Sequence, residues 1–230
     1  MDVDVPGIGL VDSVMLEFIQ SGGPFMWLLI LMSVISLALV LERTVALRWR
    51  RVLPAVLEER VEACSSAGEL AALRSICDAD QSPLSRLLAG VIERRHWVRA
   101  ENIDALQTRA RKEVAGLERG LVIIEVVVGS APLLGLVGTL HGLITLFGDF
   151  GEASLGNNAA LAKGISIALN TTLTGLLIAI PSLIAWSYFN KKVESLTIEM
   201  ETLCDLLVQR LYAPEEPQRE SGAGLRDPLA

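Results

Sequence analysis

Three stretches of the chain contain no Asp, Glu, Lys or Arg: residues 18–41, 126–148 and 164–190. A helix needs about 20 apolar residues to cross the roughly 30 Å hydrocarbon layer of a bilayer. Each stretch is long enough and is dominated by aliphatic residues and glycine. The pattern predicts an all-α protein with three transmembrane helices.

Between the first two stretches, residues 55–119 have a helical pattern with a turn signal at residues 80–83. Ser82 is placed to cap a helix that has Pro83 at its first position. Five apolar residues then recur at helical spacing, opposite a charged face: Leu84, Leu87, Leu88, Val91 and Ile92. We expect helices that pack on extensions of the spans rather than a separate domain.

A second amphipathic pattern follows the third stretch. Its apolar residues are spaced alternately by three and four, which is typical of a heptad seam: Val193, Leu196, Met200, Leu203 and Leu207. Such a seam packs either on its own chain or on a neighbouring subunit. Two heptads do not distinguish between these alternatives.

The charges give the spans a direction. Of the 20 Lys and Arg residues, 14 lie between Arg43 and Arg119 and five follow the third stretch, whereas the loop 148–163 carries only Lys163. The positive-inside rule therefore predicts that the N-terminus and this loop face outward and the C-terminus faces the cytoplasm. The segment before the first span is acidic, unlike the start of a signal peptide, so we expect that span to be retained.

These signals divide the chain into eight segments. They are a periplasmic tail (1–24), transmembrane helix 1 (25–47), a cytoplasmic helical region (48–120), transmembrane helix 2 (121–147), a periplasmic loop (148–163), transmembrane helix 3 (164–189), a cytoplasmic helix (190–212) and a disordered C-terminal tail (213–230). After the first span, we expect Glu42, Arg43 and residues 48–51 to form a collar at the lipid headgroups.

The composition, 51% hydrophobic and 20% charged, fits this separation of apolar and charged segments. A net charge of −7, with basic residues interleaved among acids, argues against nucleic-acid binding. Cys64, Cys77 and Cys204 have no CxxC spacing, so we expect buried thiols and neither a disulfide, a metal nor another cofactor. No Walker A, HExxH or nucleophile-elbow motif occurs, which argues against an enzyme.

The second span is rich in small residues, which let helix backbones approach closely. Gly135, Gly138 and Gly142 predict tight packing on another helix, and Ser130 is a candidate pore or interface position. Pro132 removes one backbone hydrogen bond, and such breaks persist where neighbouring helices, hydroxyls or water satisfy the freed carbonyl.

The third span gathers polar side chains in its outer half: Asn170, Thr171, Thr172 and Thr174. Asn170 has no favourable place against lipid, so we expect it to face protein or a wet cavity. The hydroxyls, however, can bond to carbonyls of their own helix. These residues alone leave pore lining and structural packing equally open.

A proton relay ordinarily needs a titratable group within the membrane. The second and third spans carry no Asp, Glu, Lys or Arg, so any proton that this chain moves is expected to travel on a partner's carboxylate. His141 can titrate, but the pattern favours a packing or interface role. For Glu125, at the inner end of the second span, we expect an ion pair with a base such as Arg119 rather than a role at a proton exit.

The second-span run APLLGLVGTLHG, residues 131–142, resembles the AP–x–x–GL–x–GT–x–x–G pattern of the TolQ/ExbB/MotA proton-channel family. The third span matches the family at its own spacing, through Gly164, Ile165, Ala168, Leu169, Thr172, Gly175, Leu176, Ala179, Ile180 and Pro181. The resemblance covers about residues 117–195. Three spans favour the TolQ/ExbB branch over the four-span MotA branch.

The resemblance implies a homo-oligomer, a pentamer, in the bacterial inner membrane. It would surround an ExbD/TolR-like single-span partner whose Asp carries the proton, and the motor would work on a TonB/TolA-like envelope protein. Thr139 and Thr172 occupy the family's two path-lining threonine positions, which favours a functional role for them. Gly175 and Pro181 fall at packing and kink positions. The seam at residues 193–207 is then expected to pack on neighbouring subunits as well.

The chain departs from the family pattern at two positions. Ile167 stands where many members have Glu, and His141 stands where Trp is frequent. The loss of that Glu leaves open whether the ion is H⁺ or Na⁺. The same loss leaves a second hypothesis open: the chain is a non-conducting membrane scaffold of the same fold.

Overall fold

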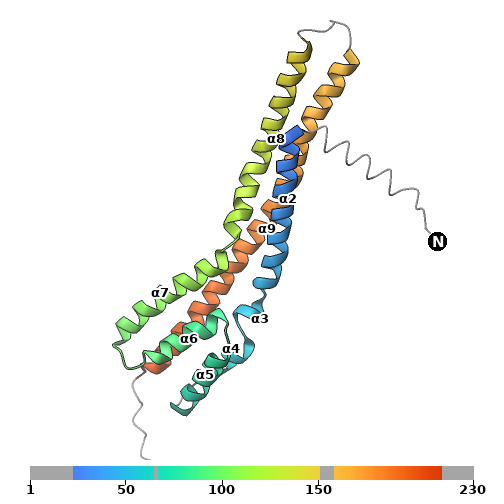
Figure 1. Ribbon diagram of the computed structural model, residues 1–230. Coiled ribbons are helices and arrows are strands. Elements are labelled where there is room, and N and C mark those ends of the chain that lie inside the picture. The colour runs from blue at the N-terminus through green and yellow to red at the C-terminus, as the bar shows by residue number, and fades with distance from the viewer. Residues whose placement is uncertain (1–22, 65–66, 151–157, 214–230) are drawn as a thin grey trace, which may run out of the picture. The chain divides into compact units, whose positions relative to one another are not determined.

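The computed structural model describes residues 23–64, 67–150 and 158–213, and every element in these residues is a helix (Figure 1). The all-α prediction is confirmed. The helices are α2 (Gly23–Ala46), α3 (Trp49–Val52), α4 (Ala55–Ala63), α5 (Ala67–Ala79), α6 (Pro83–Glu93), α7 (Arg99–Glu118), α8 (Leu121–Phe150) and α9 (Asn158–Leu211). They form two compact units, Met1–Val52 with Arg111–Ile198 and Leu53–Ala110 with Glu199–Ala230.

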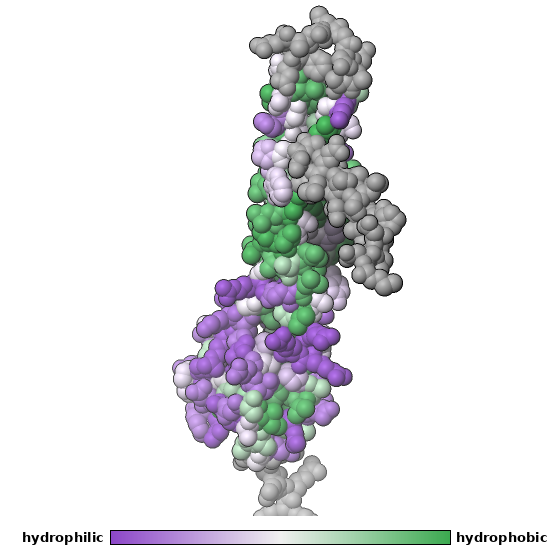
Figure 2. All heavy atoms as spheres, turned by 45° about the vertical axis from the view of Figure 1, so that its right-hand side comes forward, coloured by the Kyte–Doolittle hydropathy of each residue, from purple (hydrophilic) through white to green (hydrophobic). Residues whose placement is uncertain are grey.

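The first unit contains the three helices that are long and apolar enough to cross a membrane: α2, α8 and α9, the last of which continues into the second unit. They meet in an apolar core formed by Leu29 of α2, Val127 and Ala131 of α8, and Ala179 of α9. Large apolar side chains on all three helices are exposed, and hydrophobic residues gather on one part of the face shown in Figure 2, apart from the hydrophilic residues. Monomeric soluble proteins rarely expose so large an apolar surface to water. The prediction of three membrane helices is confirmed.

The helices extend beyond the ranges predicted for the spans. Helix α8 reaches Phe150, and α9 begins at Asn158, so part of the expected loop 148–163 is helical. Helix α9 continues unbroken past residue 189, in agreement with the expected helical extension of the third span. The expected tails 1–24 and 213–230 lie almost entirely outside the described residues.

The five seam residues of α9 are buried within the chain itself, with exposed fractions of 3% at most: Val193, Leu196, Met200, Leu203 and Leu207. The expectation that the seam packs on neighbouring subunits is therefore wrong. Heptad spacing identifies an apolar face, but it does not identify the surface that covers this face.

In the second unit, α6 begins as the sequence predicts. The backbone N–H of Ser85 donates to the Ser82 hydroxyl at 3.1 Å, and Pro83 is the first helical residue. The predicted apolar face, from Leu84 to Ile92, is buried. The three cysteines are free and buried as expected, and burial raises the pKa of the Cys77 thiol to about 11.

Arg43 lies at the end of α2 and is only 9% exposed. Its guanidinium donates to the carbonyl of Leu117 at 3.1 Å and pairs with Glu42 at 2.9 Å. It also lies beside Gly120, whose φ of 92° turns the chain from α7 into α8. Arg43 therefore packs at the junction between α2, α7 and α8.

Candidate functional site

Helices α8 and α9 approach each other most closely at two glycines. A Cβ atom on Gly175 would lie 2.5 Å from the backbone oxygen of Ala131, and one on Gly135 would lie 2.8 Å from that of Thr171. Carbon atoms in favourable contact lie about 3.5–4.0 Å apart. No larger residue therefore fits while the helices stay in place. Similar approaches to α9 occur at two further glycines of α8: Gly138 and Gly142.

Three threonine hydroxyls meet beside this crossing, and we call them the threonine cluster: Thr139 of α8 with Thr171 and Thr172 of α9. The Thr139 hydroxyl is hydrogen-bonded to that of Thr172 and lies 3.4 Å from that of Thr171. Thr139 and Thr171 are buried, whereas Thr172 is half-buried. The two threonines singled out from the sequence are therefore in direct contact.

Two backbone carbonyls accept hydrogen bonds from the cluster. The carbonyl oxygen of Ala168 lies 2.7 Å from the Thr171 hydroxyl and 3.0 Å from the Thr139 hydroxyl. The carbonyl oxygen of Gly135 lies 3.1 Å from the Thr172 hydroxyl. A hydroxyl has one proton to donate and two lone pairs. Each proton of the cluster therefore has an acceptor within the chain, while lone pairs remain for water or another donor.

The other polar candidates in the spans bond mainly within their own helices. The Ser130 hydroxyl donates to the carbonyl of Val126, and the Thr174 hydroxyl donates to that of Asn170 at 2.8 Å. The side-chain amide of Asn170 is half-buried and has no hydrogen-bond partner among the described residues. Asn170 is therefore a polar group open to a neighbouring molecule or water.

Glu125 is exposed and makes no ion pair with any residue that the structure describes, so the expected pair with Arg119 is not formed. Pro132 and Pro181 both lie inside continuous helices, α8 and α9. Within the described part of the chain, no group of three His, Cys, Asp or Glu side chains is arranged to hold a metal ion.

Two polar features were missed from the sequence: the contact between Ser36 and Ser182, and the place of Thr171 in the threonine cluster. The hydroxyls of Ser36 and Ser182 lie 2.7 Å apart and join α2 to α9, and both residues are 4% exposed. Thr171 was noted only as part of a polar run. A serine in an apolar span needs a partner for its hydroxyl. Ser36 was therefore a detectable candidate, although its partner was not.

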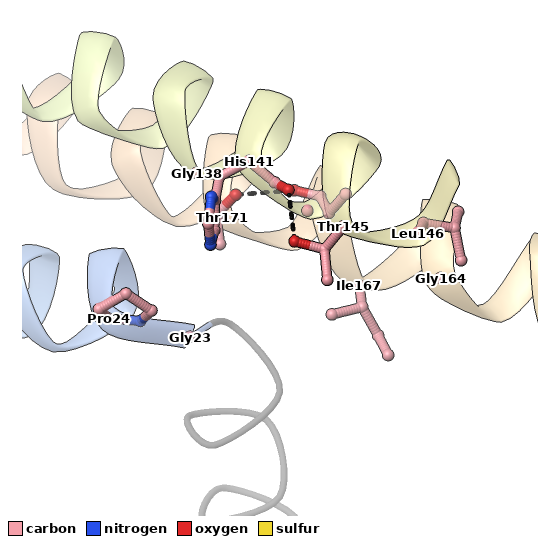
Figure 3. A pocket seen from close by; sticks show the side chains of 11 residues that line it. Gly23, Pro24, Gly138, His141, Thr145, Leu146, Gly164, Ile167 and Thr171 are labelled. Carbon is pink, nitrogen blue, oxygen red and sulfur yellow. Dashed lines mark hydrogen bonds between the residues drawn. The ribbon is translucent and has the colours of Figure 1, made fainter. Parts of the chain in front are cut away.

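A hollow of about 310 Å³ lies next to the threonine cluster, between the first residues of α2 and the facing sides of α8 and α9. Figure 3 shows Pro24, His141, Thr145, Ile167 and Thr171 around it. We call this space the His141 hollow. The His141 ring is exposed and packs edge-on against Phe25, with 5.5 Å between ring centroids.

Comparison with known proteins decides the family. The model of the MotA/TolQ/ExbB proton channel family matches residues 79–202, more than half of the chain. The chain belongs to this family. The match includes the threonine cluster, the close-approach glycines and the first three seam residues, which therefore lie within the family's common region.

Curated relatives include homologues of the biopolymer transport protein ExbB. The chain is 30% identical to one from Methanothermobacter thermautotrophicus, over 78% of this chain and 64% of the relative. It is 32% identical to an ExbB-like protein of Synechocystis, over 74% of this chain and 68% of the relative. It is 26% identical to ExbB of Neisseria meningitidis, over 84% and 94% respectively. Together with three apolar helices, these relatives make it a membrane protein of the ExbB type.

Proposed function

We propose that the chain is the polytopic subunit of a motor in the bacterial inner membrane that is driven by the proton-motive force. Several copies, five by analogy with the family, would surround an ExbD/TolR-like partner with a single span. Ion flow would then power work on a TonB/TolA-like envelope protein or transport across the outer membrane. The N-terminus would face outward and the C-terminus the cytoplasm, as the charge distribution predicts.

The threonine cluster is the observation that carries this proposal. Thr139 and Thr172 touch across the α8–α9 crossing at a depth where the spans contain no Asp, Glu, Lys or Arg. Their hydroxyls can donate to a carboxylate and accept from water, so they can stabilise both charge states of a partner's acid. Thr172 is half-buried, which leaves it accessible to such a partner.

A non-conducting scaffold is the second candidate. Two observations favour it: Ile167 lies where a carboxylate is frequent in the family, and every proton of the threonine cluster already has an acceptor within the chain. In a scaffold the cluster would serve only to hold α8 to α9.

Substitution of the two threonines distinguishes the candidates. Thr139→Val and Thr172→Val keep the shape of the side chain and remove its hydroxyl. In vesicles that contain the chain and its partner, each variant is expected to abolish ion flux while oligomers still form. Thr44→Val is the matched control, because the Thr44 hydroxyl donates to Val40 of its own helix at 2.7 Å and is exposed. Full flux in both cluster variants would refute the assignment of the path.

Co-purification tests the partner. Under native expression, the chain is expected to carry with it a single-span protein that has a membrane Asp. Recovery of a stable oligomer without such a protein would favour the scaffold.

A further inference from the structure

The His141 hollow is large enough to hold water, and three of its eleven lining residues have polar side chains. At roughly 30 Å³ for each water molecule, its 310 Å³ has room for on the order of ten. Its polar lining includes the imidazole of His141 and the hydroxyls of Thr145 and Thr171. Water persists in such a space when polar groups are present to bond it, whereas apolar cavities stay empty.

The polar groups around the hollow still have capacity for water. The proton of Thr145 goes to the carbonyl of His141 at 3.0 Å, and that of Thr171 goes to Ala168 at 2.7 Å, so both hydroxyls retain lone pairs. The ring nitrogens of His141 have no hydrogen-bond partner among the described residues. Water is the partner that fits all three.

Thr171 joins the hollow to the threonine cluster. Its side chain lines the hollow, and its hydroxyl lies 3.4 Å from that of Thr139, which is bonded to Thr172. Polar groups are therefore continuous from the imidazole, through the hollow, to the pair of threonines.

His141 is the one titratable side chain at this place among the described residues. The lining from α2 is Gly23 and Pro24, with Phe25 against the ring, and the lining from α8 and α9 contains no Asp, Glu, Lys, Arg, Cys or Tyr. An imidazole ring can accept a proton on one nitrogen and release one from the other.

We propose that the His141 hollow is a hydrated antechamber and that His141 takes up and releases protons there for the threonine cluster. A hydronium ion in the hollow gives its proton to the free ring nitrogen, which leaves water and an imidazolium. The imidazolium then returns a proton to a water that is bonded to Thr171. This inference rests on the proposed function for its role in flux, whereas hydration and titration of the hollow do not depend on it.

Histidine titration tests the proposal without any flux. The sequence has two histidines, so a ¹⁵N-histidine spectrum of the chain in lipid nanodiscs contains two imidazoles, and His96→Gln identifies the other one. The His141 signals are expected to move reversibly between pH 5 and 8, and His141→Gln removes them. Signals that do not change over this range would overturn the proposal.

Labelling tests the hydration of the hollow. Ile167 lines it, and the three native cysteines are buried, so Ile167→Cys introduces one accessible thiol. A charged, membrane-impermeant thiol reagent is expected to label it. Labelling by an apolar maleimide but not by the charged reagent would show a space filled by lipid and would refute the antechamber.

Flux measurements connect the hollow to transport. In vesicles with the partner, the unmodified chain and His96→Gln are expected to show an inflection of flux with pH that His141→Gln loses. An unchanged inflection in His141→Gln would overturn the relay role. Failure of the proposed function looks different, because the unmodified chain then carries no flux at any pH while titration and labelling still report on the hollow.

Discussion

Replacement of Gly175 by alanine tests whether the α8–α9 crossing holds the threonine cluster together. The added Cβ would lie 2.5 Å from the backbone oxygen of Ala131 and 3.3 Å from the Cα atom of Gly135. The first of these neighbours is backbone in the middle of a helix, so it cannot rotate away as the end of a side chain would. The helices must move apart.

The size of the effect follows from the geometry. Restoring a contact of about 3.5 Å separates the backbones by about 1 Å. Overpacking of this kind costs about 1–3 kcal/mol. The same movement stretches the bond from the Thr172 hydroxyl to Gly135, now 3.1 Å, beyond hydrogen-bonding distance, which costs about 1 kcal/mol more. The helix preference of alanine over glycine offsets about 1 kcal/mol of this cost. We therefore expect Gly175→Ala to lower the free energy of unfolding by about 1–3 kcal/mol.

The measurement is unfolding in mixed micelles, followed by helical circular dichroism as the fraction of denaturing detergent rises. Gly129→Ala is the matched control, because a Cβ at Gly129 of α8 would meet nothing within 4 Å. Alanine favours helix over glycine by about 1 kcal/mol, so this control is expected to be neutral or stabilised. If Gly175→Ala unfolds at the same point as Gly129→Ala, the crossing is not as close as described and the reasoning fails.

Two further predictions concern the second unit. Ser82→Ala removes the acceptor for the Ser85 N–H and is expected to lower the free energy of unfolding by about 1 kcal/mol. The same unfolding assay measures it, with Ser195→Ala on the exposed face of α9 as control. Equal stability of the two variants would contradict the cap. Burial, partly offset by Arg74, raises the pKa of Cys77 to about 11 from 9.0, so its neutral form stabilises the fold fully below pH 9, and this contribution is lost as the pH rises toward 11. Alkylation followed by mass spectrometry should therefore be slow at pH 8 until the chain unfolds, and rapid alkylation of the folded chain would contradict this.

The sequence predicts well those features that depend on local pattern. Length and apolarity identify the spans, and Ser82 with Pro83 marks the start of α6 because a cap and the first helical turn are set by adjacent residues. Extension of the third span beyond residue 189 was also predicted, because the apolar residues keep helical spacing from Val193 to Leu207.

The periodicity of the sequence does not predict which distant segments pack against each other. The spacing from Val193 to Leu207 specifies an apolar face but not the surface that packs on it, so the pattern left own-chain and subunit packing open. Only the family resemblance favoured packing that includes neighbouring subunits. For the same reason Ser36 and Ser182 remained two unrelated hydroxyls, and Thr171 was not distinguished from its neighbours. The family resemblance singled out Thr139 and Thr172, but the contact between them was not predicted.

The hydrogen bonds of the threonine cluster show why packing and ion transfer do not exclude each other. The bond between Thr139 and Thr172 can run in either direction, since Thr172 can donate to Gly135 and Thr139 to Ala168. Both arrangements satisfy every proton. A partner's carboxylate that approached Thr172 would replace a neutral bond, worth about 1 kcal/mol net, by a charge-assisted one worth about 1.5–3 kcal/mol.

The gain from that exchange is about 1 kcal/mol, which is several-fold in an equilibrium constant. The carboxylate would therefore be bound only while it is charged, because a protonated acid is a weaker acceptor and the hydroxyl can return to the carbonyl of Gly135. In the proposed motor, the Thr172 hydroxyl would donate its proton to the carbonyl of Gly135 when no charged acid is near. It would donate the same proton to the partner's carboxylate when that acid is charged. A valine at position 172 would remove both states at once, whereas a serine would keep both. Thr172→Ser should accordingly retain flux, and its failure would show that the methyl group, and not the hydroxyl exchange, carries the function.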